Sequence, residues 1–254
     1  MNKRLWPLFL GGFVSLLPFA TAKGNTGELL RRSVIVGDNS YDYQVFVPSK
    51  LSDSKDAPVK DAPVIVFLHG IGQRGSGGVV ATEGPTGTIV RHYLEKVGAV
   101  IVLPQCRAGM YWSTPEMDQM VMKEVDDVKA SLKADTRRIY LTGVSMGGYG
   151  VWHLASQHPG RFAALVSVCG GSSLQTGDRF TPIAKMIGRT PVWIFHGEDD
   201  KVVPVTESRQ MAAALRAIHG DVHYNEYPSV GHNVWMKVIE EKQLVPWLLK
   251  QRLP

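Results

Sequence analysis

Five β-rich apolar runs constrain the fold of this 254-residue chain more than any other feature. They cover residues 63–70, 98–105, 137–143, 162–171 and 191–197. Their apolar residues follow one another without regular polar alternation, which is typical of parallel strands buried on both faces of a sheet. Helical stretches separate the runs. The pattern therefore predicts an α/β fold with a mostly parallel central sheet and helices on both faces.

The helical stretches are expected at residues 86–97, 115–134, 147–158, 205–220 and 232–252. The second is the clearest, because its apolar residues recur at helical spacing: Met117, Met120, Val121, Val125, Val128 and Leu132. In the last stretch, Pro246 is expected to kink or split the helix.

Strands are also expected outside the five runs. Residues 31–37 and 41–49 are β-rich and are joined by a short polar turn, so they predict a hairpin. A further strand is expected at 222–228.

The N-terminus has the features of an export signal. Lys3 and Arg4 precede a 16-residue apolar run, 5–20, and Ala20-Thr21-Ala22 fits a cleavage site. The alternative is an uncleaved membrane anchor, but the run is shorter than the ~20 residues that span a bilayer. We expect residues 1–22 to be a signal peptide and residues 23–254 to form one catalytic domain that is secreted or periplasmic.

Composition argues against several classes of protein. The net charge of +5 becomes +3 (5 − 2) without Lys3 and Arg4, and no basic run of five residues is present, so nucleic-acid binding is not expected. The sequence lacks C-x-x-C and H-E-x-x-H patterns, so neither a metal site nor a cofactor is expected. The two cysteines, Cys106 and Cys169, are too few for a disulfide scaffold and are expected to be free buried thiols.

Ser145 lies in Gly143-Val144-Ser145-Met146-Gly147, between the strand at 137–143 and the helix at 147–158. A G-x-S-x-G frame at a strand-to-helix turn is the pattern of a nucleophile elbow. The glycines are needed because a side chain at either position would collide with neighbouring backbone. The alternative is an ordinary turn in which the serine caps the helix.

A serine nucleophile requires a base and an acid that orients the base. In chain order, Asp199 and Asp200 follow the strand at 191–197, and His232 precedes the last helix. Both places are loops after strand ends, where ligand sites of α/β sheets lie. His232 is the expected base, and either aspartate could be the acid.

From about Tyr41 to the C-terminus the chain resembles the α/β-hydrolase superfamily. It is most similar to small secreted esterases of the feruloyl-esterase and polyhydroxybutyrate-depolymerase type and to related predicted peptidases of the prolyl oligopeptidase type. The motifs that carry the resemblance are 69–72 (HGIG), 104–106 (PQC), 143–148 (GVSMGG), 196–204 (HGEDDKVVP) and 231–232 (GH). No linker interrupts the alternation of strands and helices and no stretch is long enough for a lid domain, so a single domain without a large lid is expected.

The resemblance also implies roles for individual residues. The spacing H-G-x-x-D-x-x-V-P selects Asp200 as the acid, and the oxyanion would be bound by the backbone N–H groups of Ile71 and Met146. His69 and His196 would support loops of the site. Trp112 would either shape the substrate pocket or pack in the core.

Together these features predict a serine carboxylic-ester hydrolase that acts on short-chain esters or on esters of aromatic acids and polysaccharides, without a cofactor. The expected partner is a small-molecule or polysaccharide-linked ester substrate, with no nucleic acid and no stable membrane association after signal cleavage; the oligomeric state stays open. Two alternatives remain open: a serine peptidase or aminopeptidase of small peptides, and an inactive binding protein on the same fold.

Overall fold

The structure is a computed structural model that describes residues 27–51, 61–75, 97–174 and 176–254. The expected signal peptide at 1–22 and nearly all of the expected helix at 86–97 lie outside the described residues. Within the described part, no helix is both long and apolar enough to cross a membrane.

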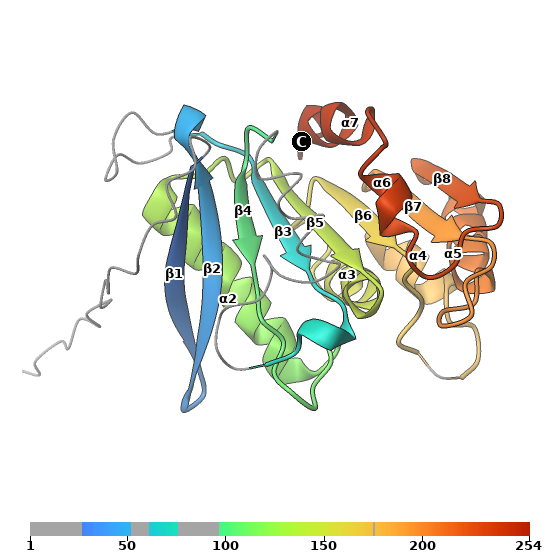
Figure 1. Cartoon of the computed structure of the whole chain (residues 1–254), viewed down its shortest axis with the longest axis horizontal. Coiled ribbons are helices and arrows are strands. Elements are labelled where there is room, and N and C mark those ends of the chain that lie inside the picture. The colour runs from blue at the N-terminus through green and yellow to red at the C-terminus, as the bar shows by residue number, and fades with distance from the viewer. Residues whose placement is uncertain (1–26, 52–60, 76–96, 175) are drawn as a thin grey trace, which may run out of the picture.

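A central eight-stranded sheet organises the fold, with strand order β1-β2-β4-β3-β5-β6-β7-β8 (Figure 1). Strands β3 to β8 run parallel, whereas β2 pairs antiparallel with both β1 and β4, which confirms the predicted hairpin and the mostly parallel sheet. The strands are β1 Gly27–Val36, β2 Asn39–Pro48, β3 Val64–Leu68, β4 Val100–Leu103, β5 Ile139–Val144, β6 Ala164–Val168, β7 Val192–Gly197 and β8 Val222–Tyr227.

Residues of the central strands alternate between two hydrophobic cores, one on each face of the sheet. On β3, Val64, Val66 and Leu68 belong to one core, while Ile65 and Phe67 belong to the other. Successive side chains of a strand point to opposite faces, so a strand covered on both faces must be apolar throughout. This arrangement explains why the predicted runs showed no polar alternation.

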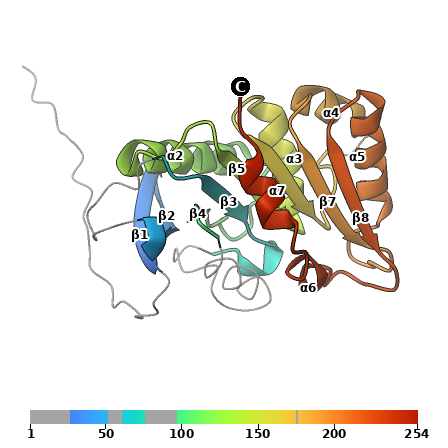
Figure 2. The same cartoon turned by 90° about the horizontal axis from the view of Figure 1, so that it is seen from above.

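Helices cover both faces, as predicted. Viewed from above, α2 to α5 lie on one side of the sheet and α6 and α7 on the other (Figure 2). The helices of the described residues are α2 Pro115–Leu132, α3 Met146–Gln157, α4 Thr181–Ile187, α5 Thr206–Ala217, α6 Trp235–Val238 and α7 Leu244–Lys250, with 3₁₀ turns at η1 Ser49–Leu51 and η2 Ile71–Gln73.

The C-terminal helix differs from the prediction. The break between α6 and α7 falls before Leu244, and Pro246 lies in the first turn of α7 instead of at the split. Proline fits there because the first N–H groups of a helix have no intrahelical acceptor. The short helix α4 was not predicted, because seven residues offer too little periodicity.

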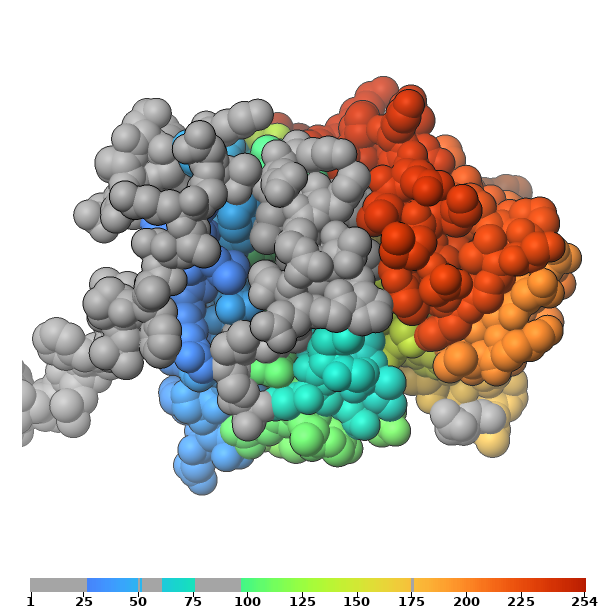
Figure 3. All heavy atoms as spheres, in the orientation of Figure 1, coloured from blue at the N-terminus to red at the C-terminus, as the bar shows by residue number. Residues whose placement is uncertain are grey.

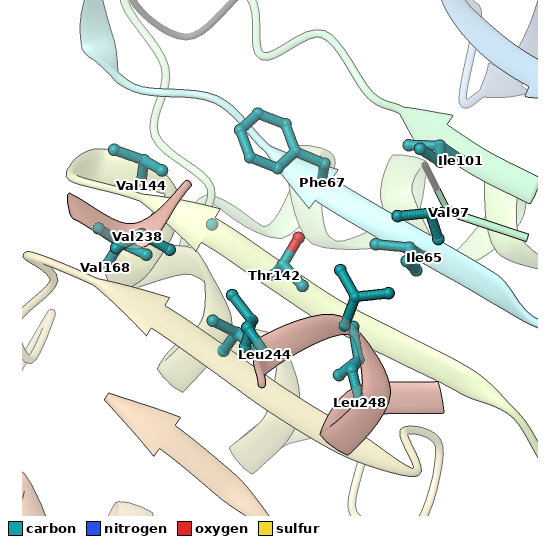
Figure 4. A pocket seen from close by; sticks show the side chains of 13 residues that line it. Ile65, Phe67, Val97, Ile101, Thr142, Val144, Val168, Val238, Leu244 and Leu248 are labelled. Carbon is teal, nitrogen blue, oxygen red and sulfur yellow. The ribbon is translucent and has the colours of Figure 1, made fainter. Parts of the chain in front are cut away.

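An apolar cavity of about 60 Å³ lies between the sheet and the C-terminal helices (Figure 4). Phe67 and Val144 line it from the sheet, and Val238 and Leu248 line it from α6 and α7. Neither Ser145 nor His232 contributes to its walls. The cavity is therefore a feature of the packing between sheet and helices.

Glu124 is a carboxyl group buried in the contact between α2 and the sheet. Its side chain has no solvent exposure, and neither carboxyl oxygen has a hydrogen-bond partner among the described residues. Burial, together with the nearby charge of Asp127, raises the pKa of Glu124 well above its usual value. The native protein therefore holds this carboxyl group in its neutral form at moderate pH.

We expect Glu124→Gln to raise the free energy of unfolding at pH 8. The unfolded carboxyl ionises above about pH 4.3 while the folded one stays protonated, so each pH unit between the two pKa values costs the wild type about 1.4 kcal/mol. The advantage of the variant should shrink toward pH 4, where the unfolded carboxyl is mostly protonated as well. Urea unfolding at several pH values measures this, with the exposed Glu198→Gln as control. An equal difference in the free energy of unfolding between the variant and the wild type at pH 4 and pH 8 would contradict the raised pKa of Glu124.

Candidate active site

Three predicted site residues meet at the carboxyl ends of the parallel strands. Ser145 follows β5, Asp200 follows β7, and His232 lies between β8 and α6. On the surface, atoms of the segment after β3 (cyan) and of the C-terminal part (orange and red) flank the yellow-green region of β5 and α3 (Figure 3). The site therefore draws on segments far apart in sequence.

The turn at Ser145 is strained. Ser145 has φ 57° and ψ −118°, a conformation that non-glycine residues rarely adopt. A Cβ at Gly143 would collide with the Gly147 carbonyl, and one at Gly147 would collide with the Leu68 carbonyl. The two glycines are thus required by close backbone approach, as the sequence predicted, and the serine is placed at the N-terminus of α3, where negative charge is favoured.

A hydrogen-bonded relay connects the three side chains. The His232 Nε2 atom lies 2.9 Å from Ser145 Oγ, and the Nδ1 atom lies 2.7 Å from Asp200 Oδ2. Because an ionised carboxylate can only accept, Nδ1 carries the proton and Nε2 is free to accept the serine O–H. The geometry is that of a nucleophile, a base and an orienting acid.

Asp200 is held by more than the histidine. Its side chain has no solvent exposure, and Oδ1 accepts the N–H groups of Val202 and Val203 at 2.8 and 2.9 Å. Burial would raise the pKa of Asp200, but the hydrogen bonds from His232 and the two N–H groups outweigh it and keep that pKa below the usual value. The carboxyl is therefore ionised at neutral pH.

The alternative acid, Asp199, takes no part in the relay. Its side chain is exposed, and its backbone N–H donates to the Val230 carbonyl at 2.9 Å. A Cβ at Gly197 would collide with that same carbonyl. Close backbone packing therefore fixes the acid loop against the loop that carries His232.

The two predicted oxyanion donors lie beside the serine. Met146 is the first residue of α3, and Ile71 is the first residue of η2. A Cβ built on Gly70 would lie 3.7 Å from Ser145 Cβ, so the Ile71 loop approaches the elbow closely. Neither N–H donates to another group in the described part of the chain, as is usual at the start of a helix. Both are free to bind a negative oxygen.

His69 supports this loop, as predicted, and does not belong to the relay. Its Nε2 atom accepts the Cys106 N–H at 3.1 Å, and Nδ1 donates to the Gly70 carbonyl at 2.7 Å. Burial lowers the pKa of His69 to about 4, so the ring is neutral. Trp112 is only 1% exposed, donates its indole N–H to the His69 carbonyl at 3.0 Å and packs against Gly150. This placement favours packing over a role in the pocket wall.

His196 also supports the site. Its Nε2–H donates to the Val203 carbonyl at 2.9 Å and lies 3.3 Å from Asp200 Oδ2, while Nδ1 accepts the Ser208 hydroxyl at 2.7 Å. The ring thus braces the loop of residues 200–203 against α5.

Cys169 lies beside the relay, a position that the sequence analysis did not predict. The predicted strand 162–171 extended past it, whereas β6 ends at Val168 and Cys169 has φ 42°. Its Sγ atom, a carboxylate oxygen of Asp200 and a ring nitrogen of His232 all lie within 4.8 Å of one another. Such a set could in principle bind a metal, but two of its three members are already hydrogen-bonded in the relay. Both Cys169 and Cys106 are free and buried, as predicted.

Comparisons with known proteins show the family and the fold of the chain. A family model described as Phospholipase/Carboxylesterase matches residues 104–243, a range that contains Ser145, Asp200 and His232. Among curated proteins, the bifunctional acetylxylan esterase/xylanase XynS20E of Neocallimastix patriciarum is 28% identical over 167 residues. The match covers 64% of this chain and 22% of that protein, so the chain spans about a fifth of the length of this relative.

Solved structures give the same fold. A thermostable esterase is similar with a TM-score of 0.70 and 30% identity, covering 88% of this chain and 63% of the esterase. The feruloyl esterase module from Clostridium thermocellum, solved with sinapinate, has a TM-score of 0.70 and covers 94% of each chain. At 12% identity, the second likeness shows the fold alone.

Proposed function

Since the chain belongs to the phospholipase/carboxylesterase family of α/β-hydrolases, we propose that it is a serine carboxylic-ester hydrolase. The single observation that carries this proposal is the relay from Ser145 Oγ through His232 to Asp200, with contacts of 2.9 and 2.7 Å. Ordinary turns and caps do not require a strained serine, a buried carboxylate and an oriented imidazole at one strand edge.

The mechanism follows from the positions of the atoms. His232 Nε2 takes the proton as Ser145 Oγ attacks the ester carbonyl carbon, and Asp200 stabilises the imidazolium that forms. The N–H groups of Ile71 and Met146 bind the developing oxyanion. His232 then protonates the leaving alcohol. Water, activated by the same histidine, cleaves the acyl-enzyme and releases the acid.

We propose short acyl chains, or acetyl and aromatic acyl groups carried on polysaccharide, as the substrate class. This choice is supported by two proteins that the chain resembles: the relative named as an acetylxylan esterase and the solved structure named as a feruloyl esterase module. The expectation of an open site without a large lid concerns the connections between β3 and the turn at Ser145, the first of which joins β3 to β4. Most of that connection, residues 76–96, lies outside the described residues, so the open site stays a prediction.

We also propose that residues 1–22 direct export and that the domain of residues 23–254 acts outside the cytoplasm. The charged start, the apolar run and the Ala20-Thr21-Ala22 site support this. An exported enzyme would have access to polysaccharide esters outside the cytoplasm.

Hydrolysis of p-nitrophenyl esters of increasing acyl length, methyl ferulate, acetylated xylan and an aminoacyl p-nitroanilide tests the proposal. We expect rapid cleavage of the acetate and butyrate esters and of at least one of methyl ferulate and acetylated xylan. Cleavage of the anilide without the esters would move the assignment to a peptidase. A folded protein that cleaves none of them would favour an inactive binding protein.

A further inference from the structure

The thiol of Cys169 is a buried group that the proposed mechanism does not use. Cys169 follows β6, the strand between β5 and β7, whose ends carry Ser145 and Asp200. Its backbone N–H donates to the Phe195 carbonyl of β7 at 2.8 Å, which fixes the main chain at this point. The side chain, with no solvent exposure, therefore lies between the serine turn and the acid loop.

Val168 and Cys169 together contact the main chain of two relay residues. The Cys169 Sγ atom lies 3.7 Å from the His232 carbonyl oxygen, within range of a sulfur hydrogen bond. The carbonyl of Val168, the residue directly before it, accepts the Ser145 N–H at 2.9 Å. The segment of these two residues thus connects the loop of the nucleophile with the loop of the base.

The contact matters most for His232. In the described part of the chain, the Cys169 thiol is the hydrogen-bond donor to the His232 carbonyl oxygen, and the peptide N–H of His232 has no acceptor there. Burial raises the pKa of the Cys169 thiol well above its ordinary value, so the S–H proton stays available to that carbonyl. A neutral thiol also adds no charge beside Asp200.

We propose that Cys169 is a positioning residue, which holds the main chain of His232 against the serine elbow so that Nε2 stays within reach of Ser145 Oγ. The inference rests on the proposed esterase function. It assigns the S–H proton to a structural bond and involves no covalent step at the sulfur. Displacement of a catalytic group by about 1 Å can lower a rate by as much as 10²-fold, so a weak bond at this place can have a measurable effect.

The test compares Cys169→Ala with Cys169→Ser in the full chain, with rates corrected for the fraction of active sites titrated by a phosphonate. We expect Cys169→Ala to lower kcat about tenfold with KM within about twofold. Cys169→Ser should recover kcat to within about threefold of the wild type, because its hydroxyl offers the same donor and acceptor. Val166→Ala, a cavity-forming change in β6, the strand that precedes Cys169, should lower stability without changing kcat.

Two kinetic outcomes would overturn the proposal: a normal kcat in Cys169→Ala, or equal losses in the alanine and serine variants, which would point to lost volume alone. A second readout does not need turnover. The low-field proton resonance of the His232 Nδ1–H should shift or broaden in Cys169→Ala and return in Cys169→Ser, and an unchanged resonance would count against the proposal. Turnover that survives Ser145→Ala would defeat the assignment of Ser145 as the nucleophile, and so the proposed mechanism, while the resonance would still decide the role of Cys169.

Discussion

Ser145→Ala is expected to lower kcat for ester hydrolysis by at least about 10⁴-fold, because alanine removes the only atom that can form the acyl-enzyme in the proposed mechanism. The rest of the site stays in place. His232 remains hydrogen-bonded to Asp200, and the N–H groups of Ile71 and Met146 can still bind a carbonyl oxygen. Substrate binding should therefore change little.

A matched control is available on the same helix. Ser156 lies in α3, and its hydroxyl donates to the His153 carbonyl at 2.9 Å. Ser156→Ala should keep kcat within about twofold of the wild type. Both variants should show wild-type circular dichroism. If Ser145→Ala retained a tenth of the activity, the serine would be a structural feature of the turn and another nucleophile would be needed.

Much of the fold could be predicted because its signals are local. Unbroken apolar runs in the sequence mark the buried strands. Glycine is required at 143 and 147 because carbonyl groups of the neighbouring backbone lie too close for a side chain there. The order of Ser145, Asp200 and His232 in the chain also matches their positions after β5, β7 and β8. Site residues that follow strand ends were therefore within reach of sequence analysis.

The remainder depends on packing between distant segments, which leaves no local pattern. Glu124 has helical spacing on α2, but only the placement of α2 against the sheet shows that its carboxyl is buried without a partner. Cys169 continues an apolar run in the sequence, and only the end of β6 at Val168 turns it toward His232. The break before Leu244 similarly depends on how α7 packs over the sheet.

Replacing the acid of the relay is expected to lower kcat strongly, and the two adjacent aspartates, Asp199 and Asp200, can be compared directly. Asp200→Asn should lower kcat about 10⁴-fold at neutral pH, whereas Asp199→Asn should leave it within about twofold. The exposed Asp199 is a close control, because it is adjacent in sequence and the same atoms are exchanged. Steady-state kinetics on one short-chain ester, with stability checked by thermal unfolding, measures both.

The physical reason lies in the two N–H groups that face Asp200. Val202 and Val203 both donate to Oδ1, so the amide oxygen of an asparagine must take that place and its NH₂ group must face His232. An NH₂ group there can only donate, which forces Nδ1 of His232 to accept and moves the ring proton to Nε2. Nε2 then faces Ser145 Oγ with a proton already on it and cannot act as the base. Loss of activity in Asp199→Asn together with a normal Asp200→Asn would reverse the assignment of the acid.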